Sequence, residues 1–193
     1  MASFRIRHRE NQVTDALFDA QRAVNIMSRE IANAGFNLTN NGIVAGDSDS
    51  ESIRIRANLD RYDTNANANS RADVVDAGED IKYFVNEADD TNYLVRYDNY
   101  AATIQTRKTV LANRIDSLRI HYFAQQVNYT TTPGQCDIDP LAEVTPDTAG
   151  YIVIAVCVDL PEYGKRQTAG YQPAQKILLT GDVTLRNAGL NNY

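Results

Sequence analysis

The sequence predicts an α+β fold, in which a long N-terminal amphipathic helix packs on a mostly antiparallel β-sheet. Two observations lead to this fold class. Apolar residues recur at helical spacing up to about residue 34, and beyond residue 50 they alternate with polar residues as they do in strands. A helix with a single apolar stripe can bury that stripe on one face of a sheet. At 193 residues the chain is expected to form one domain.

The N-terminal helix is expected between about Arg9 and Ala34, since no Pro or Gly interrupts this segment. Its apolar residues follow alternating spacings of four and three, which places them in one stripe along the helix. Phe18 and Ile26 lie beside this stripe and are expected to widen it. The stripe consists of Val13, Leu17, Ala20, Val24, Met27, Ile31 and Ala34.

Gly35 and Phe36 mark the expected end of the helix. Gly35 is expected in the left-handed conformation that closes a helix, and Phe36 is expected to cover the last turn. The chain thereby divides into a frayed N-terminus over 1–8 and a single domain over 9–193, made of a helical spine over 9–36 and a β-rich head over 37–193.

Seven segments of the head are expected to contain strands, because each is rich in β-branched or aromatic residues. A polar turn joins the second and third segments and predicts a hairpin. The sixth is a continuous apolar run that suits a central strand, and Gly181 indicates a bulge or bend in the last one. The segments are 51–57, 80–86, 92–98, 102–106, 114–124, 151–160 and 176–186.

The charge of the chain argues against nucleic acid as a partner. The formal net charge is −6 and the pI is about 4.9, whereas phosphate binding needs a basic face. The acidic surplus is concentrated in residues 46–100, which hold 13 Asp or Glu and six Lys or Arg. No run of 18 apolar residues is present, so this chain is not expected to cross a bilayer itself.

The sequence does not predict an enzyme. Neither of the two histidines, His8 and His121, stands in the context of a hydrolase nucleophile. No glycine-rich phosphate loop follows a strand. His121 alternates with apolar residues in an expected strand, where a position at the surface or the edge of the core is the ordinary interpretation.

Residues 58–80 are the one segment whose side chains suggest that it could coordinate a metal ion. Asp63, Asn65 and Asn67 fall at positions 1, 3 and 5 of a calcium loop of the EF-hand kind, where oxygen ligands are needed. Ala68 and Val74 depart from that loop, which requires Gly at position 6 and Glu at position 12, so a solvated acidic loop is the alternative. The expected Ca²⁺ ligands are Asp60, Asp63, Asn65, Asn67 and Asp73, with Asp76 and Glu79 as further oxygen donors.

The two cysteines, Cys136 and Cys157, leave two alternatives open. Two thiols are too few for a structural zinc site, which needs four ligands. Either both are reduced, or they form a disulfide across a separation of 21 residues that stabilises the fold by about 3 kcal/mol. Export to an oxidising compartment would favour the disulfide.

Four motifs follow one another in an order that resembles a known family. Residues 29–36 read Arg-Glu-Ile-Ala-Asn-Ala-Gly-Phe, which is similar to the end of the first helix in type IV pilin-like proteins. The resemblance is to the PilW-type minor pilins and the J-type pseudopilins of type II secretion. Residues 51–85, 112–123 and 178–187 are similar to later strands of that family, the last through Leu185-Arg186-Asn187.

The resemblance implies a roll of one long helix on an antiparallel sheet, with no catalytic residues. The family begins with an apolar stretch of about 20 residues that spans the inner membrane, and this chain lacks it. We therefore expect a soluble fragment without the N-terminal transmembrane half-helix. The implied partners are other minor pilins or pseudopilins, the major pilin and the inner membrane, but no nucleic acid.

The function implied by the resemblance is that of a minor pilin, which helps to initiate assembly of a type IV pilus or caps it. The implied location is the inner membrane with the head in the periplasm, followed by the pilus tip. A pseudopilin of type II secretion is one alternative. A secreted adhesion domain that depends on Ca²⁺ is an alternative of another class, and it rests on residues 58–80.

Overall fold

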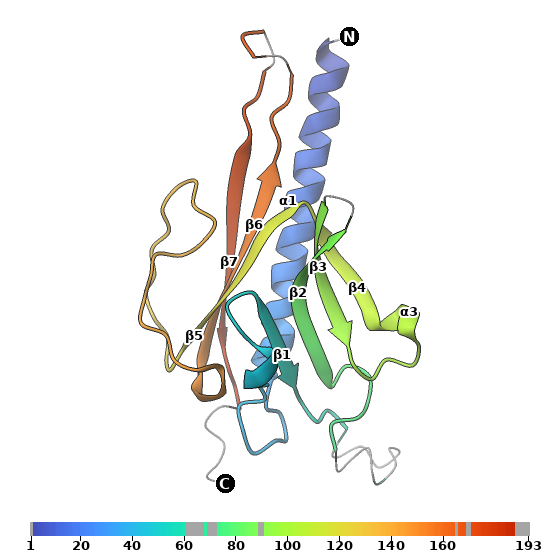
Figure 1. Ribbon diagram of the computed structural model, residues 1–193, viewed down its shortest axis with the longest axis vertical. Helices are drawn as coiled ribbons and strands as arrows, with labels where there is room; N and C mark the ends of the chain where they lie inside the picture. The colour runs from blue at the N-terminus through green and yellow to red at the C-terminus, as the bar shows by residue number, and fades with distance from the viewer. Residues whose placement is uncertain are drawn as a thin grey trace.

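The computed structural model describes residues 2–60, 68, 73–88, 91–164, 166–168 and 171–187, with the side chains of the first helix from Val13 onward. Its principal elements are a long helix, α1, and two β-sheets (Figure 1). The predicted calcium ligands Asp63, Asn65 and Asn67 lie outside the described residues.

Helix α1 spans Ala2–Ala32 and begins earlier than the expected start near Arg9. The added turns contain no Pro or Gly, and each residue that extends a helix adds a backbone hydrogen bond at little cost. Five members of the apolar stripe are at most 1% exposed, and the other two, Val13 and Leu17, are partly buried against the same core. The five are Ala20, Val24, Met27, Ile31 and Ala34.

The buried side of α1 differs from the expected one at its edge. Phe18 exposes 68% of its surface, so it does not widen the stripe, whereas Ile26 is partly buried. Ala16 and Ala23 extend the buried side instead. Small side chains at these positions allow the strands to approach the helix closely.

Sheet A has four antiparallel strands in the order β1-β2-β3-β4. The strand expected over 102–106 is wrong, because Ile104–Arg107 forms a short helix, α3. Thr103 and Thr106 form a capping box that starts this helix, and β4 follows it. The strands are β1 Ser52–Arg56, β2 Asp80–Ala88, β3 Thr91–Asp98 and β4 Lys108–Asn113.

Sheet B has three antiparallel strands in the order β5-β6-β7. Nine of the ten residues of the central strand β6 are buried, in keeping with its continuous apolar sequence. The segment between β5 and β6, residues 124–150, folds over the outer face of the sheet and packs Ile138 against it. The strands are β5 Ile115–Phe123, β6 Tyr151–Leu160 and β7 Gln175–Thr184.

The predicted fold class, one long helix on one mostly antiparallel sheet, is wrong in its sheet. The described residues form seven strands in two separate sheets, and α1 contacts β4 of sheet A as well as β6 and β7 of sheet B. The division falls between β4 and β5, where Arg114 has a φ of 57°. This left-handed residue turns the chain out of sheet A and into sheet B, and a residue other than Gly seldom adopts it.

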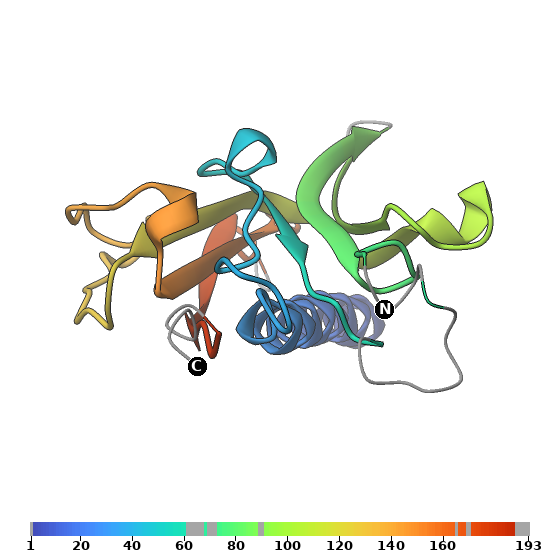
Figure 2. The same ribbon diagram turned by 90° about the horizontal axis from the view of Figure 1, so that it is seen from below.

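The two sheets lie side by side over one side of α1, which Figure 2 shows almost along the helix axis. The main core lies between the helix and the inner faces of both sheets. Gly35, with a φ of 75°, turns the chain at the end of α1, and its N–H donates to the carbonyl oxygen of Arg56 at 2.9 Å. Phe36 remains 40% exposed, so it covers the last turn only in part.

Candidate functional site

The side of α1 that faces away from the sheets is open to solvent. Both sheets lie on one side of the helix (Figure 2), and Phe18 is the most exposed large apolar residue described on the helix. No described helix is both long and apolar enough to span a membrane. A hollow of about 290 Å³, which we call the open face of α1, is lined by Phe18, Gln21, Arg22, Asn25, Ile26 and Arg29.

The open face combines an apolar centre with positive charge. Within the described part of the chain, no carboxylate lies within ion-pairing distance of Arg22 or Arg29. An exposed aromatic side chain flanked by Arg is typical of the residues that carry protein–protein contacts. The open face is therefore suited to a partner with an apolar strip and acidic or polar margins.

Glu30 sets the rotation of α1 relative to sheet A. Its carboxylate accepts hydrogen bonds from the hydroxyl of Tyr83 and from Nε of Arg96, the latter at 3.0 Å. Burial raises the pKa of Tyr83, and the charge of Glu30 raises it further, so the phenol keeps the proton that it donates. Because Tyr83 is fully buried, this contact holds the open face in one orientation.

A fully buried carboxylate, Asp80, fixes β1 against β2. It accepts hydrogen bonds from Nε and Nη2 of Arg54 at 2.7 and 2.8 Å and from Nε of Arg56 at 2.8 Å. Burial alone would raise the pKa of Asp80, but the two guanidinium groups outweigh it and hold the pKa below its usual value. The carboxylate of Asp80 therefore stays ionised at neutral pH and binds Arg54 and Arg56, both of strand β1.

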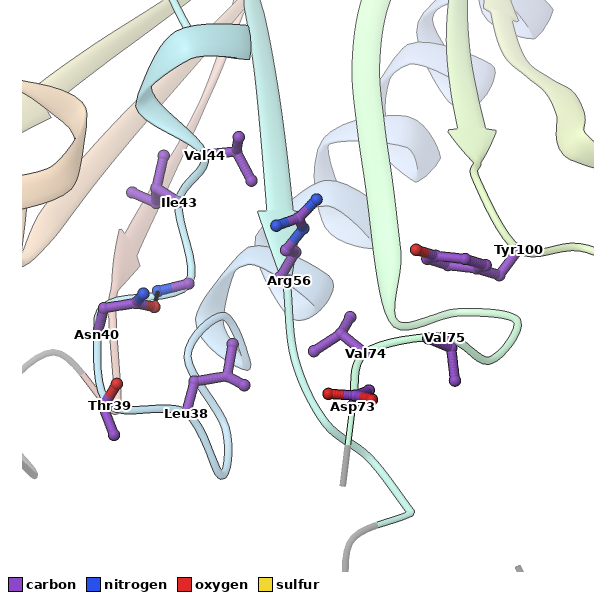
Figure 3. A pocket seen from close by; sticks show the side chains of 11 residues that line it. Leu38, Thr39, Asn40, Ile43, Val44, Arg56, Asp73, Val74, Val75 and Tyr100 are labelled. Carbon is purple, nitrogen blue, oxygen red and sulfur yellow. Dashed lines mark hydrogen bonds between the residues drawn. The ribbon is translucent and has the colours of Figure 1, made fainter. Parts of the chain in front are cut away.

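A larger hollow, of about 580 Å³, lies beyond the end of α1 (Figure 3). Leu38, Val74 and Tyr100 form an apolar wall, and Arg56 lies between them. Nε of Arg56 is already bound to Asp80. The hollow therefore combines apolar groups and one partly used cation with the polar side chains of Thr39, Asn40 and Asp73.

The structure brings together three of the carboxylates that the sequence analysis named as oxygen donors for Ca²⁺. Asp73 is exposed and lines the hollow beyond α1, while Asp60 meets Asp76 and Glu79, with one oxygen from each within 4.8 Å of the others. Glu79 accepts three backbone N–H bonds, from Leu59 and from residues 75 and 76, and so also closes its own loop. Calcium binding stays a prediction of the sequence.

His121 has contacts that the sequence did not indicate. Its Nε2 lies 2.6 Å from Oδ1 of Asp137, and its Nδ1 lies 2.9 Å from Oε1 of Glu143. Both carboxylates belong to the segment 124–150, which His121 therefore fastens to β5. No local pattern could have shown this, because the two partners lie 16 and 22 residues away. That the chain is not an enzyme stays a prediction.

Cys136 and Cys157 form a disulfide, so the alternative of two reduced thiols does not hold. Cys157 is buried in β6 and Cys136 belongs to the segment 124–150. The bridge is thus a second attachment of that segment to sheet B, next to the contacts of His121.

Comparisons with known proteins identify no relative. No protein-family model, no curated protein and no solved structure matches the chain. The likeness to type IV pilin-like proteins is therefore carried by the sequence motifs alone.

Proposed function

We propose that this protein is a minor pilin, a subunit that helps to initiate assembly of a type IV pilus, or caps it, through contacts with other pilins. The observation that carries the proposal is α1. This helix of 31 residues is held by both sheets along one side and leaves its open face to solvent. A filament subunit needs two sides of its helix: one packs against its own head, and the other contacts a neighbouring subunit.

The sequence motifs support the same proposal. The motif at 29–36 ends the helix where the head begins, and the remaining motifs follow in the order of the family. The proposal rests on the helix and these motifs, and not on the single-sheet roll, which this protein does not have. On this proposal the protein is exported, is held at the inner membrane by a segment that precedes the chain, and then enters the pilus at its tip.

The test is genetic, in the bacterium that encodes the protein. We expect deletion of the gene to lower the number of pili per cell, counted by electron microscopy. Phe18→Glu in the chromosomal gene is expected to have the same effect, because a charge at the centre of the open face opposes burial against another subunit. Ile104→Glu is the matched control, since Ile104 is 80% exposed on α3, away from the open face.

Three outcomes would decide the matter. Loss of pili in the deletion strain and in the Phe18→Glu strain, with normal pili in the Ile104→Glu strain, supports the proposal. Normal pili in the deletion strain contradict it. Normal pili together with loss of type II secretion would replace it with the pseudopilin alternative.

A further inference from the structure

His121 lies between two carboxylates on the outer face of sheet B. Its Nε2 lies 2.6 Å from Oδ1 of Asp137, and its Nδ1 lies 2.9 Å from Oε1 of Glu143. The side chain of His121 is only 12% exposed, whereas the two carboxylates are 39% and 38% exposed. Each ring nitrogen therefore meets an anionic oxygen, and little water reaches the ring.

This geometry requires two N–H donors on one ring. A neutral imidazole has one N–H and one bare nitrogen, whereas a protonated ring donates at both nitrogens. In either neutral tautomer, one of the two carboxylates would face a lone pair at hydrogen-bonding distance, which is repulsive. The observed arrangement therefore fits a ring that carries protons on both nitrogens, between two ionised carboxylates.

Arg119, two residues before His121 in β5, is a further cation on the same face. Its Nε lies 4.0 Å from Oδ2 of Asp137, and its Nη1 pairs with Glu51. Among the described residues, only His121 lies within ion-pairing distance of Glu143. Other charged groups around the segment 124–150 are bound elsewhere: Asp116 by Lys176, Asp182 by Tyr129, and Asp139 by Thr130 and Thr132.

The residues between the two carboxylates, 137–143, form a loop that is held at both ends by contacts without the ring. Cys136 precedes this loop and is bonded to Cys157 of β6. Val144 follows the loop, and its backbone N–H donates to the carbonyl oxygen of Tyr122 at 2.9 Å. His121 is thus placed to hold the loop itself on sheet B.

The loop 137–143 covers apolar side chains of sheet B. Its Ile138 is 4% exposed and belongs to one apolar cluster with Phe123, Tyr151 and Val153. The ring of His121 stacks on that of Phe123, with 6.4 Å between the ring centroids. A loosened loop would therefore uncover part of the apolar outer face.

We propose that His121 is a proton-dependent clasp, which holds the loop 137–143 on sheet B while both ring nitrogens carry protons. Because opening of the clasp releases a proton, a lower pH favours the closed loop. A free imidazole loses its second proton at about pH 6.5, and free carboxylic acids ionise at about pH 4. The clasp is therefore closed between these values, and it loosens as the pH rises above the upper one.

The test is hydrogen exchange of the whole chain at pH 5.5 and at pH 8, corrected for the faster chemical exchange of amides at higher pH. We expect the protection of 137–143 to fall by about tenfold at pH 8, as for the loss of one hydrogen bond to a charged group. Strand β7, at the edge of sheet B away from β5, is the internal control and should keep its protection.

Two variants separate the clasp from a general effect of pH. His121→Gln cannot donate to both carboxylates at any pH, so the loop should exchange fast at both pH values. Glu143→Gln replaces one anion by an amide, which can itself donate to the bare nitrogen of a neutral ring. In that variant the loop should stay protected at both pH values. Melting curves show that each variant is folded.

Equal protection of the loop at the two pH values in the wild type overturns the proposal. So does a fall that persists in His121→Gln, because another group would then cause it. Neither result bears on pilus assembly, since the loop lies on sheet B and the open face lies on α1.

Discussion

The backbones of Gly35 and Gly42 lie against each other just after the end of α1. Gly35 has a φ of 75° and Gly42 a φ of 77°. A Cβ on Gly35 would stand 2.5 Å from the carbonyl oxygen of Asn40, and one on Gly42 would stand 2.0 Å from the backbone nitrogen of Gly35. The neighbouring atoms are backbone and cannot move aside. Glycine is therefore required here both for its conformation and for its small size.

We expect Gly35→Val to lower the free energy of unfolding by more than about 1 kcal/mol, because valine is strained at positive φ and its Cβ collides with backbone. Denaturant titration followed by circular dichroism measures the change. Gly46→Val is the control, since a Cβ on Gly46 meets no atom within 4 Å. Equal stability of the two variants would mean that the end of α1 tolerates another path.

The surroundings of Asp76 raise its pKa, and this shift makes the stability of the protein depend on pH. A hydrogen bond to Asp60 raises the pKa of Asp76, and desolvation and the charges of Asp60 and Glu79 add to this shift. An acid whose pKa is higher in the folded than in the unfolded state destabilises the fold when it ionises. This loss of stability is therefore absent at pH values below 3.8, which is the pKa of Asp76 in the unfolded state. It is complete at pH values above the pKa of Asp76 in the folded state.

We expect Asp76→Asn to raise the melting temperature at pH 7, and we expect the gain to shrink as the pH falls toward 3.8. Melting curves at a series of pH values measure it, and an identical gain at every pH would contradict it. Adding Ca²⁺ to the wild type in the same assay tests the predicted calcium loop. A rise that a chelator reverses supports the loop, and no rise counts against it.

At the scale of elements, the contact between α1 and sheet B depends on one position of β7. Gly181 pairs with Ile154 of β6 in regular register, so it does not form the bulge that the sequence indicated as one alternative. Its role is close approach. A Cβ at this position would lie 2.6 Å from Cγ1 of Val24 and 2.8 Å from Oγ of Ser28.

We expect Gly181→Ala to destabilise the protein by about 1–3 kcal/mol, because the added methyl overpacks the contact between α1 and β7. Combining it with Val24→Ala should cost less than the sum of the two single changes, since the second substitution makes room for the first. Equilibrium unfolding of all four proteins gives the coupling. Strict additivity would show that Val24 is not the group that the methyl meets.

At the scale of the whole molecule, the disulfide and His121 fasten the segment 124–150 onto sheet B. We expect the double substitution of Cys136 and Cys157 by Ala to lower the free energy of unfolding by about 3 kcal/mol, from the entropy of the 21-residue separation. Hydrogen exchange should rise most within 124–150. A uniform rise over both sheets would contradict the view that the bridge acts on this segment.

Part of the fold could be predicted from the sequence because it depends on local periodicity. The stripe from Val13 to Ala34 follows from helical spacing, and β6 follows from a continuous run of β-branched residues. The short helix α3 was missed because its capping box, Thr103 with Thr106, lies in a segment that also suits a strand. The open face was missed at Phe18, because spacing alone does not show where a buried side ends.

The sequence by itself determined the long helix, the end of that helix near Gly35, and the places of most strands. Each of these follows from residues close together in the chain. Only the tertiary structure decided that the strands divide into two sheets at Arg114, that Asp60 meets Asp76, and that His121 lies between two carboxylates. The side-chain contacts among these join residues that are 16 or more positions apart, and helical or strand periodicity carries no information on such pairs.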